Sequence, residues 1–164
     1  MRAYDEITIV VPGLITAWKR VRTNRETEGH FTDPTVESYQ SGVRREAKIV
    51  MDGDPPLAGP LELSYLAVFP TLKTFSEKKR KAALAGMVFK TTRPDIENLF
   101  KGILDTLQGI VYYDDAQIIG LGRCYKIYGE RPRIELRFTV VDRVPLALPE
   151  VPAFKQPDLF AGVA

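Results

Sequence analysis

Residues 94–118 read PDIENLFKGILDTLQGIVYYDDAQI, and they contain the most regular hydrophobic pattern in the chain. Between Ile96 and Gln108 the apolar positions recur at helical spacing, about 100° per residue. One broad face collects Leu99, Phe100, Ile103, Leu104 and Leu107. The opposite face collects Glu97, Asn98, Lys101, Asp105 and Gln108. This pattern predicts an amphipathic helix that ends before Gly109 and packs its apolar face on a sheet.

The segments on either side of this helix define the fold class. Runs rich in β-branched and aromatic residues predict strands at residues 6–11, 61–69, 118–128 and 133–141. Two further helices are expected. One begins at Asp33-Pro34, with Asp33 as its N-cap and Pro34 in its first turn, and extends to about Met51; the other is a short basic helix at 76–86. The order β-α-β-α-α-β-β predicts an α/β (α+β) domain with a small mixed β-sheet and flanking helices. Residues 14–32 are polar and basic and predict a long loop.

Length and composition are those of one globular domain. The chain has 164 residues, a formal net charge of +2 and a single cysteine, Cys124. One cysteine cannot form an internal disulfide, so a reducing compartment is expected. The sequence contains neither an apolar run of membrane-spanning length nor a signal-peptide pattern, so we expect a cytoplasmic protein that does not bind a membrane.

Positive charge is concentrated in two clusters. The first consists of Lys19, Arg20 and Arg22, with Arg25 nearby, and the second of Lys78, Lys79, Arg80 and Lys81. Two basic clusters on a nearly neutral chain suggest a patch that meets an anion such as a phosphate backbone. The alternative is an ordinary solvated surface.

Carboxylates gather at both ends of the quoted stretch. Asp95 and Glu97 lie at its start, and Asp114 and Asp115 follow the helix. Hard cations such as Mg²⁺ prefer oxygen ligands, and phosphodiester hydrolysis uses such ions. Residues two apart on a helix do not face each other, so Asp95 and Glu97 can share an ion only if Asp95 is at or before the N-cap. The simpler alternative for Asp114-Asp115 is a turn.

Lys101 lies one helical turn beyond Glu97 on the same polar face. It could contact a scissile phosphate and stabilise charge in the transition state. It could equally form an i,i+4 ion pair with Glu97 or Asp105 on a solvated face.

Two segments resemble the signature of the RusA family of Holliday junction resolvases: residues 94–101 (PDIENLFK) and 114–118 (DDAQI). Family members carry a Pro-Asp-x-Asp-Asn-Leu-x-Lys segment, followed about twenty positions later by Asp-Asp-Ala/Ser-Gln. Upstream, residues 19–22 and 32–35 resemble the family's basic loop and Thr-Pro helix start, and residues 76–80 its basic helix. The resemblance extends with gaps from about residue 6 to 141.

The resemblance implies an α/β homodimer that binds four-way DNA junctions and nicks two strands symmetrically with Mg²⁺ or Mn²⁺. Carried over by position, it implies that Asp95, Glu97 and Asp115 are metal ligands, with Asp114 as a further candidate, and that Lys101 is the essential basic residue. The family usually has Asp where this chain has Glu97. The extra methylene moves the carboxylate by about 1.5 Å, a displacement to which active sites are sensitive.

The resemblance places the protein in DNA recombination and repair, in a bacterial or phage-infected cell. The basic residues of both clusters would then hold the DNA backbone through contacts that do not depend on sequence. Two alternatives remain open. One is a junction-binding protein whose catalysis is weak or lost, and the other is a metal-dependent phosphohydrolase that acts on nucleotides.

The last part of the chain carries a separate signal. Residues 143–164 are rich in Pro and small residues and predict a flexible tail beyond a 1–142 domain. Within it, Gln156, Leu159 and Phe160 resemble the Gln-x-x-Leu-Phe peptide by which bacterial replication and repair proteins bind the sliding clamp. Alternatively, Leu159 and Phe160 fold back onto this domain or onto a dimer mate.

Overall fold

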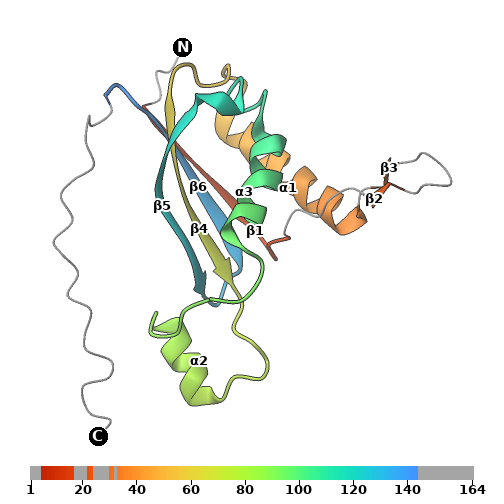
Figure 1. The fold of residues 1–164 in the computed structure, drawn as a ribbon, viewed down its shortest axis with the longest axis vertical. Helices are drawn as coiled ribbons and strands as arrows, with labels where there is room; N and C mark the ends of the chain where they lie inside the picture. The colour runs from red at the N-terminus through yellow and green to blue at the C-terminus, as the bar shows by residue number, and fades with distance from the viewer. Residues whose placement is uncertain (1–4, 17–21, 24–29, 32, 144–164) are drawn as a thin grey trace, which may run out of the picture.

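The computed structural model describes residues 5–16, 22–23, 30–31 and 33–143. The main elements are β1 (Glu6–Pro12), α1 (Pro34–Met51), β4 (Leu61–Phe69), α2 (Glu77–Leu84), α3 (Ile96–Leu107), β5 (Ile118–Tyr128) and β6 (Arg133–Val140) (Figure 1). The predicted order β-α-β-α-α-β-β is therefore confirmed. Two short strands, β2 (Arg22–Thr23) and β3 (His30–Phe31), pair within the segment that was expected to be a loop. A 3₁₀ helix, η1 (Asp115–Gln117), precedes β5.

The main sheet is mixed, as expected, with the strand order β1-β6-β4-β5. β6 pairs antiparallel with both β1 and β4, whereas β4 and β5 run parallel. The chain between β4 and β5 contains α2 and α3, the long connection that a parallel pair requires. Because of this crossover, α3 lies across the sheet, and η1 leads directly into its edge strand.

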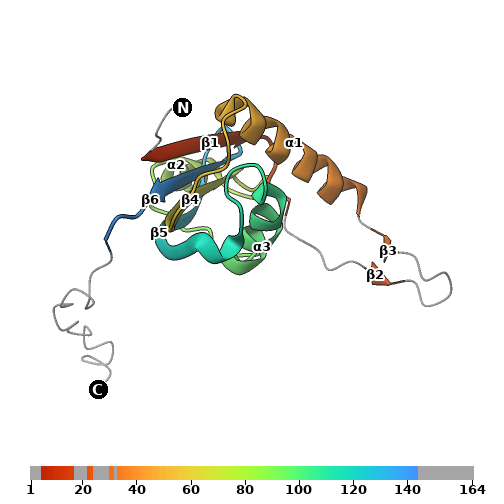
Figure 2. The ribbon, with the colours of Figure 1, turned by 90° about the horizontal axis from the view of Figure 1, so that it is seen from above.

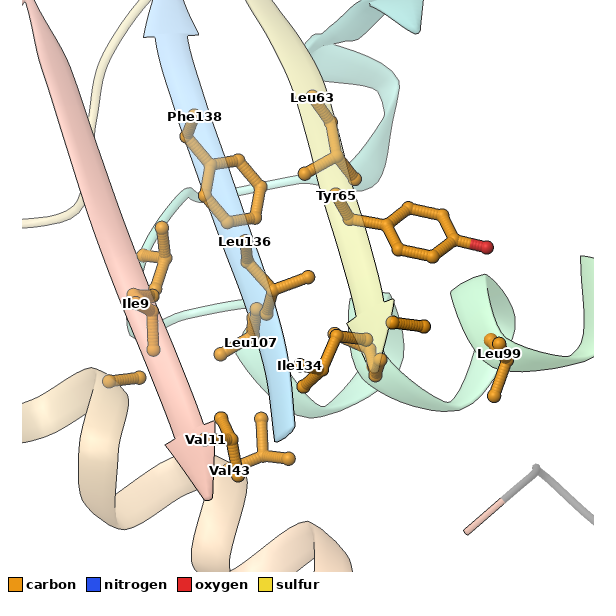
Figure 3. Packing of buried hydrophobic residues seen from close by; sticks show 14 of the residues in the cluster. Ile9, Val11, Val43, Leu63, Tyr65, Leu99, Leu107, Ile134, Leu136 and Phe138 are labelled. Carbon is orange, nitrogen blue, oxygen red and sulfur yellow. The ribbon is translucent and has the colours of Figure 1, made fainter. Parts of the chain in front are cut away.

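One face of the sheet is covered by α1 and α3 (Figure 2). Strand β1 alternates between exposed and buried side chains, and β6 contributes the fully buried Phe138. Leu99 and Leu107 of α3 are almost completely buried in the hydrophobic core, as the helical pattern predicted (Figure 3). Burying each such side chain stabilises the fold by about 1.5–3 kcal/mol.

The orientation of α3 along the sheet is set by two tyrosines. Near its first turn, the Tyr65 hydroxyl donates to the Ile96 carbonyl at 3.5 Å, and the Tyr65 and Phe100 rings pack edge to face at 4.4 Å. Near its last turn, the Tyr112 hydroxyl donates to the Leu104 carbonyl at 2.6 Å. The start of β5 therefore lies beside the C-terminal end of α3, as Figure 1 shows.

No helix in the described part of the chain is long and apolar enough to cross a membrane. The predicted tail lies outside the described residues except for Arg143, and so do the candidate clamp-binding residues Gln156, Leu159 and Phe160.

Candidate functional site

Asp95 occupies the N-cap position of α3 with an extended backbone, φ −74° and ψ 155°. Only from a position at or before the N-cap can the Asp95 carboxylate lie beside that of Glu97, because residues two apart within a helix do not face each other. The Asp95 side chain is exposed and accepts no capping hydrogen bond from the described amides of α3. Its carboxylate therefore remains available to bind another group.

The other helix starts of the described residues use their caps differently. The side chains of Asp33, Ser76 and Asp114 accept backbone hydrogen bonds at 2.9, 3.3 and 2.9 Å respectively. Aspartate is among the best capping residues, and a cap is worth about 1 kcal/mol. Asp95 does not provide this stabilisation to α3, which is the pattern expected of a carboxylate used for binding.

Two lysines hold the chain immediately before Asp95. Lys90 is only 7% exposed, and its ammonium donates to the Thr92 carbonyl at 2.9 Å, the Thr92 hydroxyl at 2.6 Å and the Arg93 carbonyl at 2.6 Å. Lys126 of β5 donates to the Pro94 carbonyl at 2.8 Å and to the Thr92 carbonyl at 3.2 Å. Burial, and then the nearby positive charge of Lys126, lower the pKa of Lys90.

The sequence motifs include neither lysine. Lys126 has a sequence signal, because it falls on the inward-facing alternation of its strand, in register with the buried Ala67. A lysine at such a position requires hydrogen-bond partners. The sequence around Lys90 contains no comparable signal.

Asp114 and Asp115 have different surroundings although they are adjacent. Asp114 is the N-cap of η1, and its carboxylate accepts from the Ala116 amide. Gln117 completes a capping box by accepting from the Tyr113 and Asp114 amides at 2.7 and 3.0 Å. Asp115 is exposed, at the first position of the turn. The geometry thus gives Asp114 a structural role and leaves the Asp115 carboxylate facing solvent.

Tyr112 locates Asp115 relative to α3. Burial raises the pKa of the fully buried Tyr112, and the negative charges of Asp115 and Asp105 raise it further. The Asp115 carboxylate therefore lies near the part of α3 that contains Leu104 and Asp105. Asp95 is at the other end of the same helix.

This arrangement separates the predicted ligands within one chain. The nine residues from Asp95 to Leu104 correspond to about 14 Å of helical rise, whereas ligands of one Mg²⁺ ion each lie about 2 Å from it. Among the described residues, no three histidine, cysteine, aspartate or glutamate side chains form a group that could hold a metal ion. Asp95, Glu97 and Asp115 therefore do not form a metal-holding group among the described residues of one chain, and their role as metal ligands stays a prediction.

The remaining site candidates are distributed as follows. Glu97 and Lys101 are exposed on the first two turns of α3, close to Asp95. Lys78, Lys79, Arg80 and Lys81 are exposed on α2, which lies beyond the end of the sheet in Figure 1. Within α2, Lys79 lies 4.5 Å from the Phe75 ring centroid and Lys81 pairs with Glu77 at 3.0 Å. Lys19 and Arg20 lie outside the described residues, and only the backbone of Arg22 is described, in β2.

Comparison with known proteins agrees with the sequence motifs. The family model described as endodeoxyribonuclease RusA matches residues 12–139. An uncharacterized protein of Bacillus subtilis (strain 168), YqaN, is 31% identical over 138 residues, which cover 80% of this chain and 94% of that protein. The crossover junction endodeoxyribonuclease rusA of Lactococcus phage r1t is 43% identical over 54 residues, 32% of this chain and 40% of the phage protein.

Proposed function

Because this chain belongs to the RusA endodeoxyribonuclease family, we propose that it resolves four-way DNA junctions by paired, metal-dependent nicks during DNA recombination and repair. The observation that carries the proposal is the state of two motif aspartates. Asp95 and Asp115 are both exposed, and the Asp95 side chain does not cap α3. Asp114, directly before Asp115, does cap its helix, η1. This division supports binding roles for Asp95 and Asp115 and a structural role for Asp114.

The residues present suit Mg²⁺ or Mn²⁺. Asp95 and Glu97 offer exposed carboxylate oxygens at the start of α3. Mg²⁺ commonly uses one or two carboxylates together with substrate phosphates, so this pair and a DNA phosphate form a reasonable partial ligand set. The bound ion would supply an activated water and neutralise charge at the scissile phosphate. Lys101, one turn along α3, would provide a further positive charge beside the phosphate.

Asp115 would complete the site from a second copy of the chain. Within one chain it lies toward the opposite end of α3 from Asp95. In a twofold dimer that brings two α3 helices together in opposite directions, the start of one helix lies beside the end of the other. Asp95 and Glu97 of one protomer would then meet Asp115 of its partner, and two equivalent sites would face the two equivalent strands of a four-way junction.

The basic helix α2 would bind the DNA backbone. Its four consecutive cations are exposed, and it connects to the Asp95 segment through residues 85–94. Phosphate contacts of this kind position the substrate without reading its sequence. Such contacts support a polynucleotide substrate over a mononucleotide.

The test uses two variants, Asp95→Asn and Asp115→Asn, with the exposed Asp52→Asn as the matched control. Each of the first two should lose cleavage of a labelled four-way junction by about 100-fold or more and retain junction binding in EDTA. The two inactive variants are then mixed and allowed to exchange subunits. If sites are shared between protomers, the mixed dimer contains one intact site and produces singly nicked junctions. Normal cleavage by Asp115→Asn would contradict the assigned site.

A mixture that stays inactive, although mass spectrometry detects the mixed dimer, would contradict sharing between protomers. In that case, the loss of cleavage in each single variant would still support nuclease activity, with both aspartates acting within one protomer.

A further inference from the structure

We infer that Lys90 and Lys126 act together as a lysine clamp that positions Asp95 and thereby releases its carboxylate from the capping role that an N-terminal aspartate usually has. They are positioning residues, because their ammonium groups contact backbone atoms of the segment before Asp95. This inference rests on the proposed function only for what Asp95 then binds.

The first step concerns the number of bonds. A lysine ammonium has three donors, and Lys90 uses them on two atoms of Thr92 and on the Arg93 carbonyl. Lys126 adds the Pro94 carbonyl and a second bond to the Thr92 carbonyl. Three consecutive carbonyls, the last one directly before Asp95, are thus held by two positive charges.

The second step concerns the energetic cost. Burying a charge is unfavourable unless it is hydrogen bonded, and two ammonium groups that share the Thr92 carbonyl also repel each other. The short hydrogen bonds that Lys90 donates offset part of this cost. The Phe69 ring also contributes, because the Lys90 ammonium lies 4.9 Å from the ring centroid. Hydrogen bonds in which the donor is charged are stronger than those between neutral groups, so the arrangement fixes the segment despite the repulsion.

The third step connects the clamp to the cap. A capping side chain normally fixes the direction in which a chain enters its helix. In α3 the lysine clamp fixes this direction instead. Lys90 packs against Phe69 of β4, Lys126 belongs to β5, and both ammonium groups hold backbone atoms that precede the helix. Asp95 keeps an extended backbone while its carboxylate stays in solvent, next to Glu97. The two strands beneath α3 thus determine where the first carboxylate of the site lies.

The experiment compares Lys90→Met and Lys126→Met with Lys73→Met, the same change at an exposed lysine outside the clamp. Hydrogen exchange of the apo protein is measured over residues 91–99 by mass spectrometry. Loss of the clamp should speed exchange of the Leu99 amide, which donates to the Asp95 carbonyl at 3.3 Å, by at least about tenfold. Exchange near Leu107 and in the sheet should stay unchanged.

Mn²⁺ titration gives the second readout. Supporting groups around a metal ligand are typically worth about 10- to 100-fold in metal affinity, and we expect a loss of this size in Lys126→Met. Lys126 is partly buried, and Lys126→Arg keeps the positive charge and the hydrogen-bond donors there, so it should restore most of the Mn²⁺ affinity. Unchanged exchange at residues 91–99 in both folded Met variants would overturn the clamp. Faster exchange with unchanged Mn²⁺ affinity would overturn its positioning role.

Failure of the proposed function gives a different result. A wild-type protein that binds no Mn²⁺ and cuts no junction contradicts the nuclease, whereas the exchange comparison still decides whether the clamp holds the Asp95 segment.

Discussion

Replacing Gln117 by Met should destabilise the protein and displace Asp115. The Gln117 amide joins two segments: its oxygen accepts from the Tyr113 and Asp114 amides, and its nitrogen donates to the Leu57 and Gly59 carbonyls at 3.0 and 2.8 Å. Met preserves the approximate volume and removes all four bonds. Because Gln117 is partly exposed, water can replace some of them, and the low value of about 0.5 kcal/mol per bond applies.

The total loss is therefore about 2 kcal/mol, which corresponds to a decrease in Tm of roughly 4–8 °C for a chain of this size. Urea denaturation followed by circular dichroism measures it, with Gln108→Met as the control because Gln108 is exposed. The control should change stability by no more than about 0.5 kcal/mol. Displacement of Asp115 by about 1 Å should also lower junction cleavage by about 100-fold. Equal stability of the two variants would refute the bracing role of Gln117.

Three further perturbations test other parts of the molecule. Removing two α2 charges, with Lys79→Gln and Arg80→Gln, should flatten the dependence of log K on log salt for junction binding by about 0.9 for each DNA phosphate that is no longer neutralised; an unchanged slope would place α2 away from DNA. Because burial raises the pKa of Tyr112 above its ordinary value of 10.0, the folded protein keeps a proton that the unfolded chain loses above pH 10, so stability falls as pH rises beyond that point. Tyr112→Phe should make this fall shallower, by an amount that approaches about 1.4 kcal/mol per pH unit above pH 10, measured by urea denaturation at pH 9–11, and an identical slope would contradict it. Glu97→Asp should retain junction cleavage while Glu97→Gln loses about 100-fold, and full activity of the Gln variant would remove Glu97 from the site.

Local patterns predicted the elements well. The apolar positions around Leu99 and Leu107 predicted α3 to within one residue at its C-terminal end, and Asp33 was correctly expected to cap α1. These features depend on neighbouring residues, so a single sequence contains the information. The pairing order of the strands depends on contacts between distant segments. It could not be obtained from local patterns alone.

The site was less predictable, for two physical reasons. The Asp-x-x-Gln spacing of Asp114 and Gln117 is a capping-box signal, and it distinguishes Asp114 from Asp115. Because the same residues also belong to the acidic motif, the spacing by itself does not show which of the two roles each aspartate has. The distance between Asp95 and Asp115 follows from the length of α3, which separates residues that appear close in the motif. Lys90 is different, because its contacts arise from tertiary packing against Phe69 and carry no local signature.

The most direct measurement incubates the purified wild-type protein with a labelled four-way junction or with linear duplex of the same sequence, in Mg²⁺, Mn²⁺ or EDTA. If the metal ion is held by Asp95, Glu97 and Asp115, we expect paired symmetric nicks in the junction, none in the duplex, and none in EDTA. A tight junction complex that yields no product in either metal ion would contradict the nuclease and leave a junction-binding protein with the same fold.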